Sequence, residues 1–402
     1  MTNTSTKLLK NKFIQSIMIS GILLQIGIWV RNFAILLFVM EKTNNNPYAV
    51  SLISIAEFTP ILLFSFIGGT FADRWRPKRT MVTCDLLSAV SVFVVLLAII
   101  FDSWKSVFFV TFVSAILSQF SQPSAMKLFK SNLHPDDIQL GMTLFQTMMA
   151  IFMIIGPGLG TFVYHHMGIN VSIAVMGVAF FLSAAALSRI PPDPKESTVA
   201  QSHFIRELID GFHYVWKSKV LRIMGGVFLS AGLGVGLLQT LNVFIVIERL
   251  GLPKENVQWL FMANGAAMLI GGAVLMKYSN KISPQNLLAI GMTVNGFAML
   301  GSGLSTVLPL TLCTEFLAGF FMPCIQIGIN TLILQKSEEA FVGRVNGVLN
   351  PLFMAGMVLT MCLAGWLKSI FAIAPLICSA GVLFFIGALM LIPILGPKHE
   401  LI

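Results

Sequence analysis

The chain has 402 residues, of which 56% are hydrophobic and 11% are charged, and its mean hydropathy is +0.85. A soluble domain carries roughly 25% charged residues, so this composition excludes a water-soluble fold. The formal net charge of +9 would suit a nucleic-acid partner, but the distribution of the basic residues argues against one.

Apolar runs of about 20 residues recur along the whole chain, and each can cross a hydrocarbon core of roughly 30 Å. Backbone groups in lipid must be satisfied within the segment, so these runs are expected to be helices. The predicted spans are residues 13–40, 48–72, 80–101, 106–130, 140–165, 169–190, 221–248, 255–277, 284–305, 307–333, 342–367 and 370–396.

The basic residues favour one side of the predicted membrane. With the N-terminus in the cytoplasm, 20 of the 26 Lys and Arg lie at cytoplasmic ends or in cytoplasmic loops. The other six are Arg31 within a span and, outside, Lys42, Lys105, Arg249, Lys254 and Lys368. This asymmetry is the usual orientation signal of membrane proteins. We therefore expect both termini in the cytoplasm and no nucleic-acid partner.

The longest polar interruption, residues 189–222, divides the spans into two sets of six. Its prolines at 191, 192 and 194 end a helix, and residues 204–216 place apolar and charged side chains on opposite helical faces. The predicted organisation is a bundle over residues 1–190, a cytoplasmic linker with an amphipathic surface helix over 191–220, and a second bundle over 221–402.

The two halves repeat at a spacing of roughly 200 residues. Pro123 and Pro323 each lie late in a span, followed by an acidic pair and a glycine at the next helix, and residues 68–69 and 271–272 are both Gly-Gly. Parallel repeats of this kind place a substrate site at the midplane between the halves. The predicted fold class is an all-α membrane protein with twelve transmembrane helices in two pseudo-symmetric six-helix bundles.

The loop after the second predicted span, residues 69–79, reads GTFADRWRPKR. It resembles the G-x-x-x-D-R-x-G-R-[RK] loop of the major facilitator superfamily, although Arg76 stands where glycine is usual and Pro77 where arginine is usual. The resemblance implies a latch on the outward-facing conformation, and the alternative is a basic loop that only sets topology. The matching residues, and so the candidate latch, are Gly69, Asp73, Arg74 and Lys78.

The fifth predicted span contains a glycine–proline element, residues 156–160. Small residues let helices approach closely, and proline frees a backbone carbonyl. Gly156, Pro157 and Gly160 resemble the G-P-x-x-G element of antiporters in the same superfamily, which implies export; plain small-residue packing is the alternative.

Three further stretches, residues 72–75, 210–217 and 342–345, resemble the twelve-helix drug:proton antiporter subgroup that includes macrolide efflux and enterobactin exporter proteins. This resemblance implies a monomer in a bacterial inner membrane.

Three ionisable residues lie well within predicted spans, where a charge costs about 2.5 to 3.5 kcal/mol. Arg31 and Glu57 are each nine residues from the outer ends of consecutive spans, so they lie at the same depth and an ion pair is expected. The pair either exchanges a proton or statically joins two helices, or Arg31 binds a substrate carboxylate. Glu315 is a proton carrier, an anchor for a cationic substrate, or a protonated carboxyl bonded to a neighbouring helix. Asp85, nearer a cytoplasmic end, is expected to reach water or headgroups.

Amide side chains also occur within the spans. The resemblance implies that the first, fourth, seventh and tenth spans line the cavity, while interhelical hydrogen bonding is the alternative for each amide. The candidate cavity residues are Gln25, Gln119, Gln122, Gln239, Asn242, Gln326 and Asn330.

The leading prediction is therefore a secondary active transporter that exports amphipathic small molecules, either drugs such as macrolides or a siderophore-like metabolite, by alternating access. A proton gradient supplies the energy, and no cofactor or metal is expected because the five cysteines lack ligand spacing. Lipid or lysolipid transport and uptake are alternatives. A membrane-embedded enzyme or a sensor is a remote one, since no catalytic motif is present.

Overall fold

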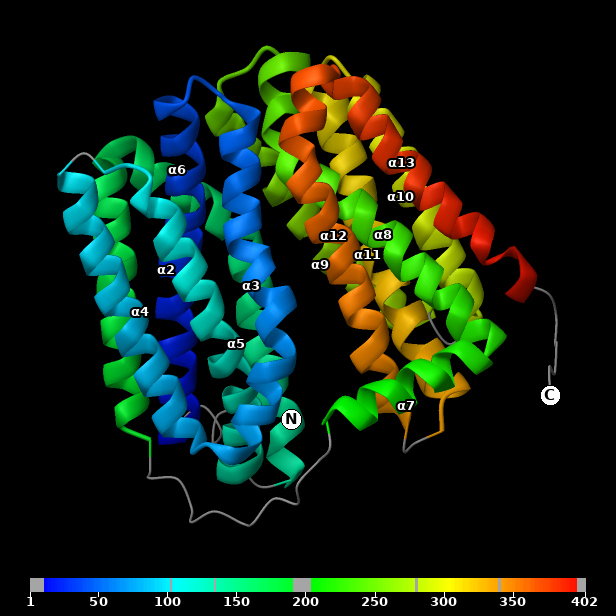
Figure 1. The fold of residues 1–402 in the computed structure, drawn as a ribbon, viewed down its shortest axis with the longest axis horizontal. Helices are drawn as coiled ribbons and strands as arrows, with labels where there is room; N and C mark the ends of the chain where they lie inside the picture. Colours follow the sequence, from blue (N-terminus) through cyan, green and yellow to red (C-terminus); the bar gives the residue numbers. More distant parts are fainter. Residues whose placement is uncertain are drawn as a thin grey trace. The chain divides into compact units, whose positions relative to one another are not determined.

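The computed structural model describes residues 11–101, 103–133, 135–190, 204–278, 281–338 and 341–395, and these residues are helical apart from short connections. Within them, ten helices are long and apolar enough to cross a membrane (Figure 1). The predicted all-α membrane fold is confirmed, and the chain is a multi-pass membrane protein.

Two of the predicted crossings, residues 140–165 and 169–190, fall within the single helix α6, Pro135–Ser188. Its 54 residues would extend about 81 Å at 1.5 Å per residue, far more than one crossing requires. Gly168 lies within it at φ 73° and ψ −178°, a conformation essentially restricted to glycine. α6 is therefore two helices joined at Gly168, as the predicted spans 140–165 and 169–190 require. With this division and the shorter apolar helix α5, the described residues provide about twelve crossings.

The remaining membrane helices follow the predicted spans closely. In chain order they are α2 (Lys12–Lys42), α3 (Pro47–Arg74), α4 (Pro77–Ile100), α5 (Ser106–Asn132), α8 (Lys219–Phe244), α9 (Val257–Tyr278), α10 (Pro284–Leu304), α11 (Leu308–Lys336), α12 (Val342–Ile370) and α13 (Ile373–Met390). Short helical turns follow α8, precede α9 and follow α13: η1 (Ile245–Arg249), η2 (Lys254–Asn256) and η5 (Ile392–Ile394).

Local capping chemistry explains where several helices begin. Pro77 and Pro284 occupy the first positions of α4 and α10, where a missing N–H costs nothing. The side chains of Asn11, Ser218 and Ser283 accept a hydrogen bond from a backbone N–H in the first turn of α2, α8 and α10.

The chain divides into two compact units: residues 1–45 with 56–200, and residues 46–55 with 201–402. The start of α3 groups with the second unit because it packs against α12. A Cβ on Gly365 would lie only 2.8 Å from the Cα of Tyr48, and the Tyr48 hydroxyl is 3.0 Å from Ser369 Oγ. The predicted linker boundaries stay a prediction, since residues 191–203 lie outside the described part.

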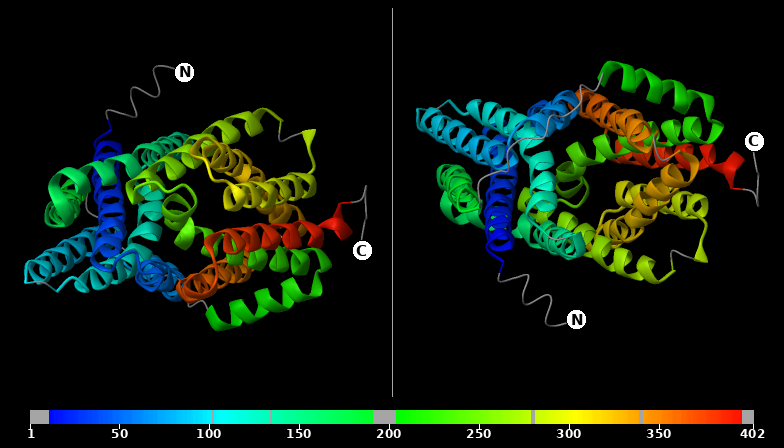
Figure 2. Two further views of the ribbon diagram at one scale, coloured as in Figure 1. Left: turned by 90° about the horizontal axis from the view of Figure 1, so that it is seen from above. Right: turned by 90° about the horizontal axis from the view of Figure 1, so that it is seen from below.

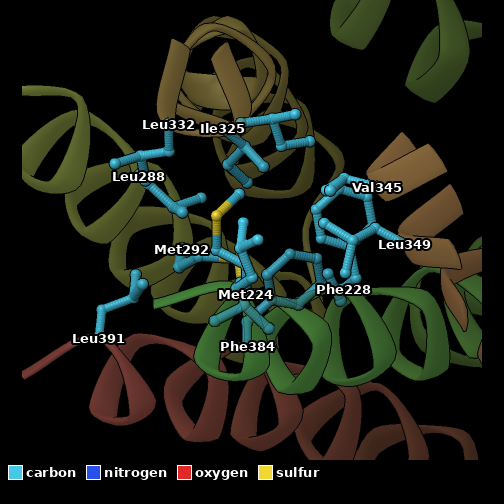
Figure 3. Close-up of a cluster of buried hydrophobic side chains, with 14 of the residues drawn as sticks. Met224, Phe228, Leu288, Met292, Ile325, Leu332, Val345, Leu349, Phe384 and Leu391 are labelled. Atoms are coloured by element: carbon cyan, nitrogen blue, oxygen red, sulfur yellow. The ribbon is translucent and has the colours of Figure 1, made fainter. Parts of the chain in front are cut away.

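Each unit has its own apolar core. In the second unit, buried side chains from α8, α10, α11, α12 and α13 converge, with Met224 and Phe228 of α8 beside Val345 and Leu349 of α12 (Figure 3). In the first unit, residues near the starts of α2 and α4 pack against the end of α5, where Phe13 and Phe129 meet edge to face at 5.6 Å.

Helix α7, Phe204–Lys217, belongs to the second unit and lies beside α12 and α8 (Figure 2). Gly211 allows it to contact the backbone of Arg344, and Tyr214 stacks on Phe341 at 4.4 Å. Phe212 and Trp216 stack on each other and are 54% and 62% exposed. An apolar exposed edge of this kind suits a helix at a membrane surface.

Candidate transport sites in the two units

The first unit contains a buried polar cluster built on α2, α3 and α5. Nη2 of Arg31 lies 3.6 Å from Oε1 of Glu57, and Nη1 donates to Oγ of Ser114 at 2.5 Å. Nε and Nη2 of Arg31 donate to Oδ1 of Asn32 at 2.8 and 2.5 Å, and Nδ2 of Asn32 donates to Glu57 Oε1 at 3.1 Å. Asn32 therefore connects both members of the expected pair.

Arg31 and Glu57 differ in how far their side chains are buried. The Arg31 side chain is 6% exposed and that of Glu57 is 26% exposed. Three guanidinium nitrogens already donate within the cluster, so little of Arg31 is left for a substrate carboxylate. The carboxyl group of Glu57 is the charged group with access to its surroundings.

The second unit contains a different site, around Glu315 of α11. Glu315 is 3% exposed, and Nδ2 of Asn264 of α9 donates to its backbone oxygen at 3.2 Å and to Oε2 at 3.4 Å. Among the described residues no Lys or Arg forms an ion pair with it. The Glu315 carboxyl group thus has polar but uncharged neighbours among the described residues, the amide of Asn264 and the hydroxyl of Ser302.

The predicted cavity amides of the second unit are mostly exposed. Gln239 of α8 and Gln326 and Asn330 of α11 are exposed, and the latter two lie four residues apart on one face. Exposed amides on helices that are otherwise apolar favour contact with water or a ligand. Asn242 is 6% exposed, and its Oδ1 has no hydrogen-bond partner among the residues that the structure describes.

The amides of the first unit are engaged within the helices. Gln25 accepts from Trp29 Nε1 at 3.1 Å, and its Nε2 lies 2.8 Å from the sulfur of Met149 on α6. Gln119 bonds within α5, to the Ala115 oxygen at 3.4 Å. Interhelical or local bonding therefore describes these two residues better than a free cavity face. The side chain of Gln122 lies outside the described part of the structure.

The glycine–proline element of α6 forms the tightest contact with α2. A Cβ on Gly156 would lie 2.4 Å from the Trp29 ring, and one on Gly160 would lie 2.5 Å from the Trp29 backbone oxygen. Pro157 lies in the turn between them. The element thus lets α6 and α2 approach closely at Trp29, which is two residues before Arg31 on α2.

The candidate latch is described only at Lys78. Its Nζ donates to the backbone oxygen of Ser188 at 2.8 Å and also to that of Ile190, which ties the start of α4 to the end of α6. The side chains of Asp73 and Arg74 and the surroundings of Gly69 lie outside the described part of the structure, so the latch role of these three residues stays a prediction.

The expectation that Asp85 reaches water is wrong. Asp85 is 3% exposed, Ser183 Oγ of α6 donates to its Oδ2 at 2.6 Å, and Ser20 Oγ of α2 is 2.7 Å from Ser183 Oγ. Asp85 lies on the same helical face as Met81 and Ser88, which are also buried. The spacing of residues 81, 85 and 88 indicates that they share one helical face, and this was the signal that could have predicted the burial of Asp85. The depth of a residue along a helix does not say which face it occupies.

Ser114 and Asn264 were also missed as partners of the charged groups. A serine or asparagine within a span is common and has no spacing that marks it as the ligand of a distant residue. Only packing brings Ser114 next to Arg31 across 83 residues and Asn264 next to Glu315 across 51.

A multi-pass helical fold with buried charged groups in both units is typical of membrane transporters. The sequence profile of the Major Facilitator Superfamily matches residues 17–361 and 250–401, and the chain belongs to this superfamily.

Curated relatives are similar at low identity. The chain is 24% identical to the uncharacterized MFS-type transporter YkuC of Bacillus subtilis, covering 89% of this chain and 86% of YkuC. It is 27% identical to the multidrug efflux pump Tap of Mycolicibacterium fortuitum, over 80% of this chain and 81% of Tap. It is 22% identical to macrolide efflux protein A of Streptococcus pyogenes, covering 83% and 84%. The predicted resemblance to this superfamily and to macrolide efflux proteins is confirmed.

A solved structure supports the same fold. The crystal structure of a mutant of the nucleoside transporter NupG matches with a TM-score of 0.79 over 96% of this chain and 100% of NupG, at 11% identity. At this identity the likeness shows the fold alone.

Proposed function

We propose that this transporter exports amphipathic small molecules in exchange for protons, by alternating access in a bacterial inner membrane, as a monomer with both termini in the cytoplasm. The observation that carries the proposal is the partly exposed carboxyl group of Glu57 beside the buried guanidinium of Arg31. The names of Tap and macrolide efflux protein A describe efflux, which supports the direction and the class of substrate.

Glu57 is the proposed proton-exchanging group of the first unit. Protonation would cancel its charge and so weaken the 3.6 Å contact with Arg31. Arg31 would keep its bonds to Asn32 and Ser114, so a gained proton changes the coupling of α3 to α2 while α2 and α5 stay connected. A helix contact that changes when a proton binds can shift the balance between two conformations of the transporter.

Glu315 is the proposed second proton-binding group. It is more deeply buried than Glu57, and the described groups next to its carboxyl, the amide of Asn264 and the hydroxyl of Ser302, carry no charge. No basic residue has to be displaced for it to gain or lose a proton. Glu315 therefore serves either as a second proton carrier or as a carboxyl group that releases its proton when a cationic substrate binds to it.

The exposed groups favour a neutral or cationic substrate with a large apolar part. Gln239, Gln326 and Asn330 provide donors and acceptors without charge, and the donors of Arg31 are engaged. An anionic substrate would find no matching cation at these positions.

The test is transport by purified protein in vesicles, with erythromycin and ethidium as probes and with an imposed proton gradient. Glu57→Gln and Glu315→Gln are compared singly and together, and Glu255→Gln, in the short turn η2, is the matched control. We expect export that depends on the gradient in the wild type and the control, reduced export in each single variant, and in the double variant only the level seen with the gradient collapsed. Gradient-dependent export that persists in the double variant would overturn the coupling assignment, and movement only inward would overturn the direction.

A further inference from the structure

A groove of about 640 Å³ opens on the first unit between α4 and α5. One end is basic and the other is apolar. Its main lining residues are Trp75, Arg76, Arg79, Leu87, Leu117 and Phe120.

The basic end lies at the start of α4. Arg76 precedes the first residue of the helix, and Arg79 follows three residues later, so their side chains are close together on the exposed rim. Trp75 stacks on Phe120 of α5, with ring centroids 5.9 Å apart and planes at 26°, and closes this end. Tryptophan beside arginine is typical of the boundary between headgroups and acyl chains.

The apolar end continues along α4 as an exposed stripe. Leu87 is 51% exposed, and Val90, Val94 and Leu97 follow at 60%, 55% and 58%. Their spacing of three, four and three residues keeps them on one helical face. From Arg79 to Val90 the helix rises about 17 Å, close to half of the roughly 30 Å hydrocarbon core and so to the depth of one leaflet.

We propose that this groove binds an anionic phospholipid, with the phosphate between Arg76 and Arg79 and an acyl chain along Leu87 and the stripe beyond it. The charge at one end and the apolar path at the other match the two parts of such a lipid. A free phosphate would fill only the basic end and leave the apolar wall without a partner. Arg76 replaces the glycine that is usual in this loop, so the second cation of the site is a feature of this chain. The proposal does not depend on the direction of transport.

The experiment uses quenching of Trp75 fluorescence by brominated lipid in vesicles. The full-length protein is reconstituted in phosphatidylcholine with a small fraction of brominated phosphatidylglycerol or, in parallel, brominated phosphatidylcholine. The chain has six tryptophans, so subtracting the signal of Trp75→Phe isolates the contribution of Trp75. We expect Trp75 to be quenched at a lower fraction of the anionic lipid than of the neutral one.

Three variants complete the design. Arg76→Gln with Arg79→Gln removes the cations, and each change is expected to weaken the preference for the anionic lipid roughly fivefold. Thr83→Phe places a ring on an exposed residue that lines the groove, and tests occupancy without changing charge. Arg222→Gln with Lys336→Gln, at exposed basic residues of the second unit, is the matched control and should keep the preference.

Each result bears on the proposal directly. Loss of the preference in the arginine variant and in Thr83→Phe, with the control unchanged, supports it. Equal quenching by both lipids, a preference that survives in the arginine variant, or an equal loss in the control would overturn it. Competition by millimolar inorganic phosphate alone would identify an anion site and overturn the lipid assignment.

Discussion

Each unit contains a close contact between two helices that glycines make possible, but the pairs of helices differ. In the first unit α6 approaches α2 through Gly156 and Gly160. In the second unit α8 approaches α12, and a Cβ on Gly232 or Gly236 would lie 2.2 or 2.3 Å from a backbone oxygen of α12. The second contact is as close and has no proline between its glycines. Close approach therefore needs only small residues, and any antiport role of Pro157 requires a reason beyond packing.

The units differ more strongly in how they hold a buried acid. Glu57 of α3 belongs to a network with a cation and an amide of α2 and a hydroxyl of α5, whereas the described neighbours of the Glu315 carboxyl are an amide and a hydroxyl without a countercharge. A buried ion pair is costly to break at one member because the other charge is left behind, but a lone acid leaves nothing behind when it is neutralised. This difference sets the order of the expected effects of substitution.

The largest expected loss of stability comes from Arg31→Met. The substitution leaves Glu57 without a countercharge and removes the donors to Asn32 and Ser114. We expect the free energy of unfolding to fall by about 3 kcal/mol. This value is at the low end for buried pairs because Glu57 is 26% exposed. Glu315→Gln in the second unit should cost about 1 kcal/mol or less. Thermal unfolding in detergent measures both. Adding Glu57→Gln to Arg31→Met should restore part of the loss, and equal losses for Arg31→Met and Glu315→Gln would contradict the comparison.

A smaller effect is expected from Gly160→Ala. The added methyl group would meet the backbone oxygen of Trp29, which cannot move as a side chain can, and overpacking of this kind costs about 1 to 3 kcal/mol. Gly343→Ala in the first turn of α12 is the control, because no described atom lies within 4 Å of its Cβ position, and alanine there should leave stability unchanged or raise it slightly. The sign of the change in unfolding temperature distinguishes them. A stabilising Gly160→Ala would show that α2 and α6 are not packed as described.

The smallest difference is expected between the two amides. Asn32 accepts two bonds from Arg31 and donates one to Glu57, whereas Asn264 makes two longer bonds to Glu315. Hydrogen bonds to charged groups contribute about 1.5 to 3 kcal/mol and ordinary ones about 1 kcal/mol. Asn32→Ala should therefore destabilise the protein more than Asn264→Ala. The same unfolding assay measures this, and the reverse order would contradict the assignment of Asn32 as the connecting residue.

Much of the fold could be predicted from the sequence because hydropathy and length are local properties. The apolar runs, the turn at Gly168 and the prolines at 77 and 284 mark helix ends with no reference to distant residues. The depth of Arg31 and Glu57 likewise follows from counting residues along two helices, and the structure brings these two side chains to 3.6 Å.

Tertiary structure alone decided which way each polar side chain faces and what it meets. Asp85 is buried against Ser183, Asn32 bonds to both Arg31 and Glu57 beside their ion pair, and Gln25 is engaged while Gln326 is exposed. These outcomes depend on the rotation of each helix about its axis and on the neighbour it packs against, which close contacts such as that of Gly160 with Trp29 determine. The sequence by itself thus determined the membrane class, the spans and the depth of the charges, and packing between helices decided their partners.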